Sequence, residues 1–272
     1  MGFQELYSCN LRCGIMKNIS VDIIGSGNVA AFLCRNLLKC GVTVGRVISR
    51  NALKGEALAA ETNALRQESF TPCDDPETII ISAVKDSAAQ ELWEKCDFGK
   101  NLVLHTAGAL PLSALKVFAP NCGVLYPLQS ISASSIIESS KVPFLIEAGS
   151  SGNLERVRAL ALALSPHVQE CSSEKREKLH LAAVFANNFS NLCFRMAWEI
   201  AEKESLPPEL LLPLIRESCD KLKRLTPAQA QTGPALRWDE NIMAKHLSLL
   251  SDMPETAEFY RLASREIHRR SK

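Results

Sequence analysis

The hydrophobic positions of the chain follow two different patterns, one before and one after about residue 172. In the first part, short β-rich apolar runs alternate with segments whose apolar residues recur at helical spacing. Helices that connect successive strands in this way produce parallel pairing through right-handed crossovers, so the pattern predicts a doubly wound, mainly parallel α/β sheet. The predicted strands cover residues 19–24, 44–49, 78–84, 101–105, 123–126 and 143–147, and the helices 28–39, 52–65 and 87–95.

The second part of the chain carries helical patterns only. One long helix is predicted over residues 174–203, and it is expected to be buried because it is apolar nearly all round between Leu179 and Ala201. The other predicted features are a helix from Pro207 that kinks at Pro213, a loop over 226–234, a helix over 240–250 capped by Asp239, and a helix over 255–269. We therefore expect an N-terminal extension (1–16), an α/β domain (17–172) and an all-α domain (173–272).

Composition excludes several classes of protein. The 272 residues are 46% hydrophobic and 22% charged, which is typical of a folded chain and not of a disordered one. The net charge of +1, from 31 basic and 30 acidic residues, argues against a nucleic-acid partner. The ten cysteines lack metal-ligand or redox spacing, so we expect no metal site and small buried thiols in a cytoplasmic protein. No signal peptide or membrane span is predicted, and no membrane partner is expected.

A glycine-rich motif directly follows the first predicted strand. The sequence Gly25-Ser26-Gly27-Asn28-Val29-Ala30 has the form G-x-G-x-x-A and opens the first helix. The first glycine permits a tight turn, the second lets backbone approach a pyrophosphate, and the small last residue allows close helix–strand packing. The helix N-terminus also favours negative charge. The motif predicts a dinucleotide-binding turn, and the alternative is a turn with a structural role only.

The end of the second predicted strand indicates which dinucleotide binds. This strand ends in Ser49-Arg50-Asn51, and no carboxylate occurs between Gly25 and Glu56. NAD sites usually place an acidic residue here, where it binds the ribose 2′-hydroxyl. An arginine between two polar side chains instead suits the 2′-phosphate of NADP. The sequence therefore favours NADP (NADPH) over NAD, the alternative being that Arg50 is an ordinary exposed loop residue.

Further candidate cofactor residues follow two later strands. Ala83-Val84 is small and apolar, which suits close approach of a ribose or diphosphate. The segment His105-Thr106-Ala107-Gly108 follows the next strand, where a nicotinamide ring is expected to lie. Thr106 and the backbone around Gly108 are predicted to hold the carboxamide. For His105 two roles stay open, a catalytic residue or a buried strand histidine.

Polar residues inside the long predicted helix are the candidates for catalysis. At about 100° per residue, His180, Asn187 and Asn191 fall within one narrow stripe. Buried polar groups need partners, and a stripe that faces a cofactor could find them in substrate. His180 is then predicted to relay a proton, and the two asparagines to fix a carbonyl or carboxylate. The alternative is that all three satisfy neighbouring helices or a dimer interface.

Four residues outside this helix are candidates for substrate binding. Tyr126 and Gln129 follow a strand in the first domain, where they are expected to cover the nicotinamide. Thr232 and Arg237 of the second domain are expected to meet an anionic substrate. The alternative for both pairs is ordinary turn structure, with Arg237 at the start of the next helix.

The motifs, in their order along the chain, resemble a known family. They are Gly25–Ala30, His105–Gly108, Tyr126–Ser130, the helix from His180 to Phe189, and Thr232-Gly233-Pro234. Over residues 17–270 the chain resembles the bacterial Rossmann-like candidate NADP oxidoreductases. These are similar to deazaflavin-dependent NADP reductases and pyrroline-5-carboxylate reductases, and carry a 6-phosphogluconate-dehydrogenase-like helical domain. The resemblance implies a homodimer formed through the helical domain, with the active site between domains.

Two departures from related patterns limit what the resemblance implies. β-Hydroxyacid dehydrogenases place a catalytic lysine four residues before an asparagine, whereas Ala182 stands four residues after Lys178. The family also often has His-Pro where this chain has Tyr126-Pro127.

From the motifs and the resemblance we predict an NADP(H)-dependent oxidoreductase that transfers hydride between nicotinamide and a small carbonyl, imine or hydroxyl compound. The alternatives are a non-catalytic NADP-binding sensor and a reductase that passes hydride to a second cofactor such as a deazaflavin.

Overall fold

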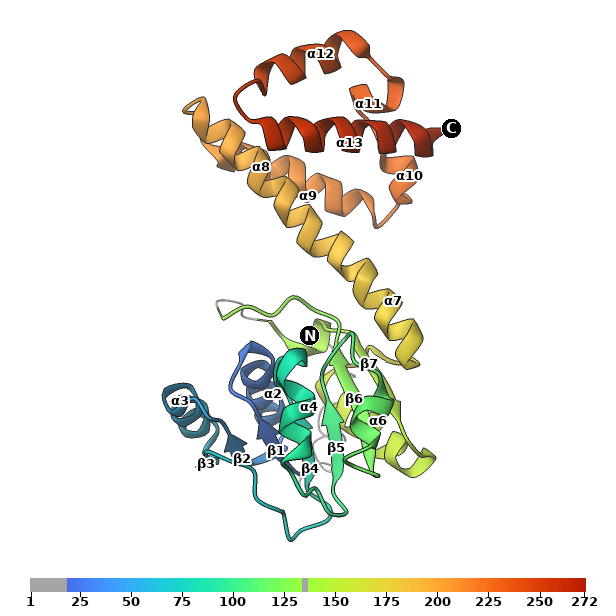
Figure 1. Cartoon of the computed structure of the whole chain (residues 1–272). Helices are drawn as coiled ribbons and strands as arrows, with labels where there is room; N and C mark the ends of the chain where they lie inside the picture. Colours follow the sequence, from blue (N-terminus) through green and yellow to red (C-terminus); the bar gives the residue numbers. More distant parts are fainter. Residues whose placement is uncertain (1–18, 134–136) are drawn as a thin grey trace, which may run out of the picture. The chain divides into compact units, whose positions relative to one another are not determined.

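The computed structural model describes residues 19–133 and 137–272, and its described part contains one eight-stranded sheet (Figure 1). The extension predicted over residues 1–16 lies outside the described residues. By internal contacts the chain divides into two compact units, the first ending at Asn187 and the second starting at Asn188. The strands are β1 (Ser20–Ile24), β2 (Thr43–Ile48), β3 (Leu65–Gln67), β4 (Ile79–Ser82), β5 (Leu102–His105), β6 (Cys122–Pro127), β7 (Phe144–Ala148) and β8 (Val168–Glu170).

The strand order in the sheet is β3-β2-β1-β4-β5-β6-β7-β8. All neighbouring strands are parallel except β6 and β7, which are antiparallel. Strands β2 and β3 follow β1 on one side of the sheet, whereas β4 lies on the other side of β1. The direction in which successive strands are added therefore switches between β1 and β4. Ligands of such sheets bind at the carboxyl ends of the strands beside this switch. The predicted doubly wound α/β fold is confirmed.

Helices cover both faces of the sheet. Side chains of α2, α3 and α6 share one core with Val21, Ile23 and Ile81, whereas α4 and α5 pack with Ile80 and Val103 on the other face. The central strand β4 is therefore apolar on both sides, as its sequence predicts. The helices of this unit are α2 (Asn28–Lys39), α3 (Ala52–Thr62), α4 (Asp86–Glu94), α5 (Leu112–Lys116), the 3-10 turn Ser139–Lys141, α6 (Ser151–Leu164) and α7 (Ser173–Ala183).

Several elements of the first unit differ from the prediction. The helix predicted over 52–65 ends at Thr62, because Asn63 adopts a left-handed conformation (φ 53°) that stops it. The chain then forms the short edge strand β3, which the sequence did not predict. Helices α5 and α6 and strand β8 were also missed. A signal for α6 does exist in the sequence, since Ser150 caps it by accepting a hydrogen bond from the Asn153 amide.

The long helix predicted over 174–203 is helical throughout but not uniform. Between α7 and α8 (Ser190–Lys203) lies a π-helical turn, Val184–Phe189. A π turn takes more residues than an α turn and therefore changes which side chains line up before and after it. The stripe predicted from about 100° per residue for His180, Asn187 and Asn191 thus assumes a regularity that the helix does not have.

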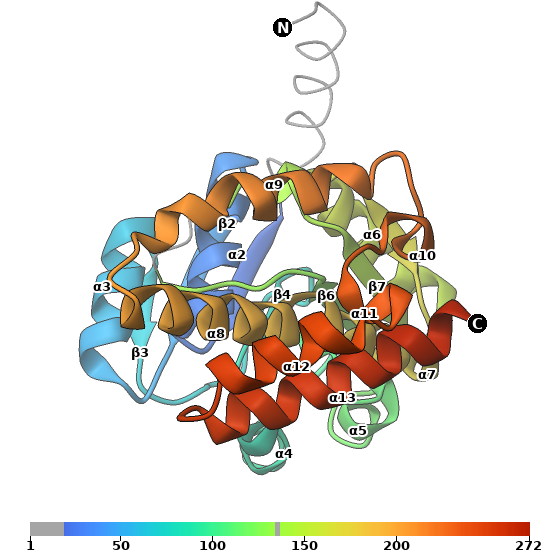
Figure 2. The ribbon, with the colours of Figure 1, turned by 90° about the horizontal axis from the view of Figure 1, so that it is seen from above.

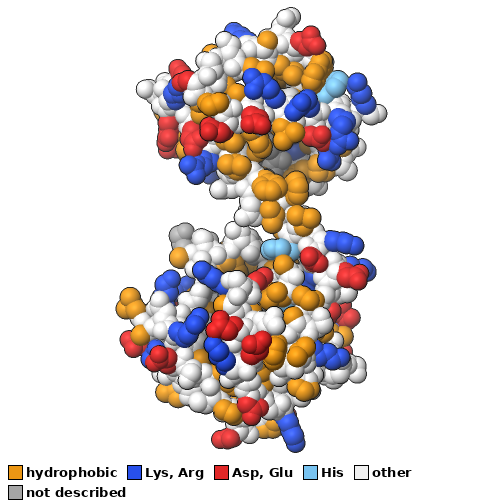
Figure 3. Space-filling view, viewed as in Figure 1, with side chains coloured by type: hydrophobic (Ala, Val, Ile, Leu, Met, Phe, Trp, Pro, Cys, Tyr) orange, Lys and Arg blue, Asp and Glu red, His pale blue; other side chains and the backbone are white. Residues whose placement is uncertain are grey.

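The burial predicted for this helix is wrong in the single chain. Leu181 and Phe185 are 58% and 60% exposed, and Asn187 and Asn191 are exposed as well. Hydrophobic side chains gather over the helical stretch that joins α7 to α8 (Figure 3). A large exposed apolar surface is typical of a site that another protein element covers. Dimerisation through the helical domain stays a prediction.

The second unit contains only helices. Pro213 lies in the first turn of α9, where proline is favoured, so it starts a helix and does not kink one as predicted. Asp239 caps α12 by accepting from the Ile242 amide, which confirms the predicted cap. Helices α12 and α13 lie side by side (Figures 1 and 2). After α8 the elements are the 3-10 turn Pro208–Leu211, α9 (Leu212–Lys221), α10 (Pro227–Ala230), α11 (Pro234–Arg237), α12 (Glu240–Leu249) and α13 (Pro254–Ser271).

The cysteines are only partly as predicted. Those that the structure describes are free thiols, and Cys34 and Cys122 are buried. Burial raises the pKa of Cys34 to about 12, so this thiol stays protonated at neutral pH. Cys193 and Cys219 are exposed, contrary to the expectation of buried thiols. No helix among the described residues is long and apolar enough to cross a membrane.

Candidate functional site

The turn after β1 has the geometry of a phosphate-binding loop. Gly25 adopts φ +123°, and a Cβ atom there would stand 2.4 Å from the carbonyl oxygen of Ala83, so only glycine fits. A Cβ atom on Gly27 would meet nothing within 4 Å. Gly27 is also the N-cap of α2, which has neither a side-chain cap nor an acidic residue in its first turn. The first amides of α2 are therefore left for an anionic group.

The residues after β2 hold this turn and begin α3. The hydroxyl of Ser49 lies 2.7 Å from that of Ser26, which joins the two strand ends. The Asn51 side chain accepts a 2.9 Å hydrogen bond from the Lys54 amide and so caps α3. The side chain of Arg50 is exposed. The hydrogen bond from Lys95 lowers the pKa of Glu91, and the charge of Arg50 adds a smaller effect in the same direction. Of the three residues predicted to meet a 2′-phosphate, Arg50 is the one whose side chain makes no hydrogen bond among the described residues.

A cleft of about 600 Å³ runs along these strand ends. It is lined by eight of the predicted cofactor residues, Gly25, Ser26, Gly27, Ser49, Arg50, Asn51, Ala83 and Val84. The lining also includes the cations Lys54, Lys85 and Lys95, against two carboxylates, Glu68 and Glu91. With Arg50 the lining has four cations against two carboxylates, and this positive balance suits a phosphorylated ligand.

Two other predicted cofactor residues of the turn do not line the cleft. The side-chain amide of Asn28 donates a 3.2 Å hydrogen bond to the Ile131 carbonyl oxygen, which anchors a later loop to the start of α2. Val29 packs against the hydrophobic core of the sheet. Their side chains therefore support the turn.

A polar cluster lies further along the same edge of the sheet. The Tyr126 hydroxyl, from the end of β6, lies 2.9 Å from Nδ1 of His180 on α7, and the two rings meet edge to face. A Cβ atom on Gly108, which follows β5, would stand 2.6 Å from the same Nδ1 atom. Glycine at position 108 thus makes room for the tyrosine–histidine pair. The structure joins three residues that the sequence assigned to cofactor, substrate and catalysis separately.

Asp86, in the first turn of α4, adds a charge to this cluster. Desolvation raises the pKa of Asp86, and the nearby His180 opposes that rise. Burial also raises the pKa of Tyr126, with a further rise from Asp86 and an opposing effect of Arg176. The phenol is therefore protonated throughout the neutral pH range and is able to donate a proton. The sequence analysis missed Asp86, although its position just after a strand end was a usable signal.

A buried ion pair fixes the start of α7 against the sheet. Arg176 is only 1% exposed, and its guanidinium donates to Glu147 of β7 at 2.5 Å and to the Leu110 carbonyl oxygen at 2.5 Å. Ser173 completes the network by donating to Glu147 at 2.8 Å. Because Arg176 lies one turn before His180, this network sets where the imidazole stands.

His105 is placed as a buried strand histidine. It is 1% exposed, its Nδ1 accepts from the Ala107 amide at 3.2 Å, and its ring lies 6.0 Å from that of Trp93. Burial lowers the pKa of His105 to about 3, with a smaller contribution from Arg176. Nδ1 as acceptor leaves the proton on Nε2, a buried atom without a hydrogen-bond partner among the described residues. The imidazole is therefore neutral, which favours the second of the two roles left open for it.

The low pKa of His105 predicts acid destabilisation of the fold. Unfolding exposes the imidazole and returns its pKa to about 6.5, so the unfolded chain binds a proton that the native chain does not. The free energy of unfolding should be fully retained above about pH 6.5 and fall between there and pH 3, by up to roughly 1.4 kcal/mol per pH unit. Urea unfolding at several pH values measures this slope.

The matched variants for this measurement are His105→Gln and His167→Gln. His167 is exposed, so its replacement should leave the dependence of the free energy of unfolding on pH unchanged. His105→Gln should make this dependence shallower below pH 6.5, whatever the substitution does to stability at neutral pH. Equal slopes in the wild type and both variants would contradict the assigned state of His105.

The other predicted site residues are not brought into the cluster. Thr106 and Ala107 are half-buried after β5, and Gln129 is exposed, with its side chain accepting from the Ser130 amide. Asn187 and Asn191 are exposed and lie on either side of the division between the two units. Their predicted catalytic roles, and an active site between the domains, stay predictions.

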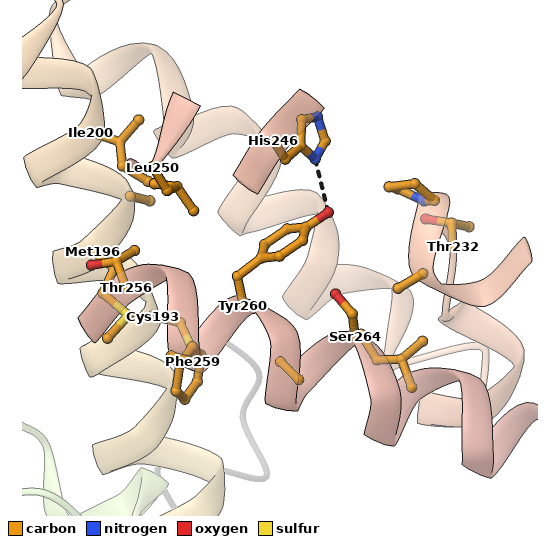
Figure 4. Close-up of a pocket in the computed structure, with 15 residues that line it drawn as sticks. Cys193, Met196, Ile200, Thr232, His246, Leu250, Thr256, Phe259, Tyr260 and Ser264 are labelled. Atoms are coloured by element: carbon orange, nitrogen blue, oxygen red, sulfur yellow. Dashed lines mark hydrogen bonds between the residues drawn. The ribbon is translucent and has the colours of Figure 1, made fainter. Parts of the chain in front are cut away.

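The two candidates of the second unit are separated as well. Thr232 lines a different cavity, within the helical unit (Figure 4), and Arg237 is exposed and not part of that lining. The predicted anionic pocket formed by both residues therefore gains no support from the geometry.

Comparison with known proteins gives the family. A model for NADP oxidoreductases, described as coenzyme F420-dependent, matches residues 20–107, and a domain of unknown function, DUF2520, matches residues 142–267. A candidate NADP oxidoreductase from Bacteroides fragilis is 36% identical, with a TM-score of 0.85, and the match covers 93% of this chain and 99% of that one. The chain belongs to this family of candidate NADP oxidoreductases. The resemblance inferred from the motifs is confirmed.

More distant structures share the fold. A protein from Thermotoga maritima is 20% identical with a TM-score of 0.70, and the match covers 92% of this chain and 98% of that one. A 1-pyrroline-5-carboxylate reductase from Streptococcus pyogenes is 13% identical with a TM-score of 0.65, covering 92% and 99%. At these identities the likeness concerns the fold alone. A search of curated proteins finds no match to the chain.

The cleft of this family member fits a dinucleotide by its own geometry. Gly25 permits the tight turn, Gly27 leaves room for a diphosphate, and the uncapped N-terminus of α2 faces that room. Phe70 lines the cleft, and its ring packs at a tilt against that of Phe98, so it offers an apolar wall for a base. The sequence analysis missed Phe70 because it lies in a loop without a motif.

Proposed function

We propose that the chain is an NADP(H)-dependent oxidoreductase that reduces a small carbonyl or imine compound or catalyses the reverse oxidation. The observation that carries this proposal is the arrangement of a dinucleotide-type cleft and the Tyr126–His180 pair along one edge of the sheet. The β4–α4 turn connects them, since Val84 and Lys85 line the cleft and Asp86 interacts with His180. Family membership supports the general class of reaction.

Each part of the site has a separate task. The bound nicotinamide would supply or accept the hydride. The turn at Gly25 and Gly27 and the N-terminus of α2 would bind the diphosphate, and Arg50 with Lys54 the 2′-phosphate. The Tyr126 hydroxyl would donate a proton to the oxygen or nitrogen of the reduced compound, and His180 Nδ1 would return a proton to the phenolate. In this proposal Tyr126 donates the proton directly. His180, which the sequence analysis predicted to relay a proton, acts through Tyr126.

NADP preference is tested by fluorescence titration with NADPH and NADH. Wild type is expected to bind NADPH more tightly. Arg50→Ala should weaken NADPH binding about ten- to a hundredfold, the value of a hydrogen bond to a charged group, and leave NADH binding nearly unchanged. Lys116→Ala, which removes an exposed cation of α5 outside the cleft, is the matched control. Equal affinities for the two nucleotides, or an Arg50→Ala variant that binds NADPH normally, would contradict the proposed preference for NADP over NAD.

An acceptor screen separates the proposed enzyme from its alternatives. NADPH oxidation is followed with aldehydes, ketones, cyclic imines and a deazaflavin at high protein concentration. Turnover of a carbonyl or imine supports the proposal, and turnover of the deazaflavin alone replaces it with hydride transfer between cofactors. Tight NADPH binding without any turnover supports the sensor.

A further inference from the structure

The segment between β3 and β4 returns across the sheet without a helix. Residues 68–78 lead from the edge strand β3 to the central strand β4 (Figure 1). The two strands point the same way, so this segment runs from the carboxyl ends of the strands back to their amino ends. All of these residues are described, and none belongs to a helix or a strand. Without the hydrogen bonds of a regular element, the course of such a segment depends on side chains that bind its backbone.

Only one half of this segment borders the cofactor cleft. Residues 68–70 line the cleft, whereas Asp75 and Glu77 do not. The side-chain amide of Asn101 donates a 2.8 Å hydrogen bond to the Asp75 carbonyl oxygen. Arg156, on α6, donates a 2.8 Å hydrogen bond to the Glu77 carbonyl oxygen. These contacts fix the half of the segment that lies away from the cleft.

Arg46, on β2, fixes the half at the cleft. Its Nη1 donates to the carbonyl oxygen and to the hydroxyl of Thr71, both at 3.0 Å, and to the side-chain oxygen of Gln67 at 3.3 Å. The guanidinium carbon also lies over the Phe70 ring, 5.4 Å from its centre. A guanidinium in this position attracts an aromatic ring. One side chain therefore holds both the ring that lines the cleft and the residue that follows it.

Asp22, on β1, orients this guanidinium. Asp22 is buried, and its Oδ2 accepts a 2.8 Å hydrogen bond from Arg46 Nε and lies 2.7 Å from Nη2. The register between β1 and β2 shifts just before Asp22, which leaves Gly45 as an extra residue between two paired positions. A Cβ atom on Gly45 would stand 3.0 Å from the Asp22 carboxylate. A bulge of this kind redirects the side chains beside it, and here it makes room for the buried ion pair.

We propose that Arg46, oriented by Asp22, is a positioning residue that holds Phe70 against the adenine base of bound NADP(H). The Phe70 ring lines the cleft and lies between the guanidinium and the ring of Phe98, so its place is set before the ligand arrives. A wall that is already ordered binds more tightly, because no side-chain entropy is lost on binding. The inference rests on the proposed binding of NADP(H).

The test measures binding of NADPH and of adenosine 2′,5′-bisphosphate, which is the adenine half of the cofactor with its 2′-phosphate. NADPH is titrated by fluorescence, and the bisphosphate by displacement of NADPH. Phe70→Ala should weaken both ligands about five- to a hundredfold, the range of one aromatic contact with a base. Arg46→Lys keeps a cation beside Asp22 but loses the planar fork that reaches Thr71. It should weaken both ligands about three- to tenfold, the cost of ordering one side chain on binding.

A double-mutant cycle shows whether Arg46 acts through Phe70. In the Phe70→Ala background, Arg46→Lys should change either affinity by less than about twofold, because the ring that Arg46 holds is gone. Arg156→Lys loosens the half of the segment away from the cleft, so this matched control should bind both ligands like the wild type. Circular dichroism identifies variants that fail to fold. If Arg46→Lys is one of them, Thr71→Val, which removes an acceptor of Arg46 at an exposed position, replaces it in the cycle.

The outcomes separate this inference from the proposed function. If the wild type binds NADPH and Phe70→Ala binds it equally well, the inference is wrong and the proposed function stands. The same holds if Arg46→Lys costs as much affinity without the Phe70 ring as with it, since Arg46 would then only stabilise the sheet. A wild-type protein that binds neither ligand contradicts the proposed function, and the inference with it.

Discussion

Gly25→Ala is expected to lower both stability and NADPH affinity, whereas Gly27→Ala should lower NADPH affinity alone. At position 25 the new methyl group would meet the Ala83 carbonyl oxygen at 2.4 Å in a backbone conformation that disfavours side chains (φ +123°). The free energy of unfolding should fall by about 1–3 kcal/mol or more. At position 27 the φ of −78° is ordinary and nothing lies within 4 Å, so stability should stay within about 1 kcal/mol of the wild type.

The two variants separate a structural turn from a ligand-binding turn. The methyl group of Gly27→Ala would stand where a diphosphate must approach the backbone, so NADPH affinity should fall at least about tenfold, or 1.4 kcal/mol. Urea unfolding measures the free energy of unfolding, and fluorescence titration measures NADPH affinity. If Gly27→Ala binds NADPH like the wild type while Gly25→Ala is unstable, the motif has only its structural role.

The sequence predicts the α/β unit well where local signals and tertiary packing agree. Residues 28–39 carry a glycine turn before them and helical spacing within them, and α2 has the predicted bounds. The strand Ile79–Ser82 is apolar on both faces and lies at the centre of the sheet. β3 and β8 were missed because each is only three residues long and is held by pairing with a distant strand.

The candidate site was predicted in parts but not as a whole. Gly108, Tyr126 and His180 were each singled out, yet only the fold brings them from β5, β6 and α7 to one place. The stripe that placed His180 with Asn187 assumed a regular helix, and the π turn at Val184–Phe189 has no signal in the apolar pattern. Burial was also predicted from apolarity alone, which does not say whether the covering surface belongs to the same chain.

Tyr126→Phe is expected to lower turnover about 10²- to 10⁴-fold with little change in NADPH affinity. The substitution removes the hydroxyl that lies 2.9 Å from His180 and keeps the aromatic ring in its pocket. Turnover is measured with an acceptor found in the screen, and NADPH affinity by fluorescence titration. Tyr126→His, which restores a proton-bearing group at this position, should recover part of the turnover.

The pH profile shows whether the hydroxyl is the proton donor. Because the donor must be protonated, the rate should fall as pH rises through the pKa of Tyr126, which burial and Asp86 hold above the ordinary value of about 10. Asp86→Asn removes that negative charge, lowers the pKa of Tyr126 and should shift the alkaline fall to lower pH. A merely structural role for Asp86 would leave the position of the fall unchanged. Normal turnover in Tyr126→Phe, or an alkaline fall that persists in it, would exclude Tyr126 as the donor and leave His180 or water.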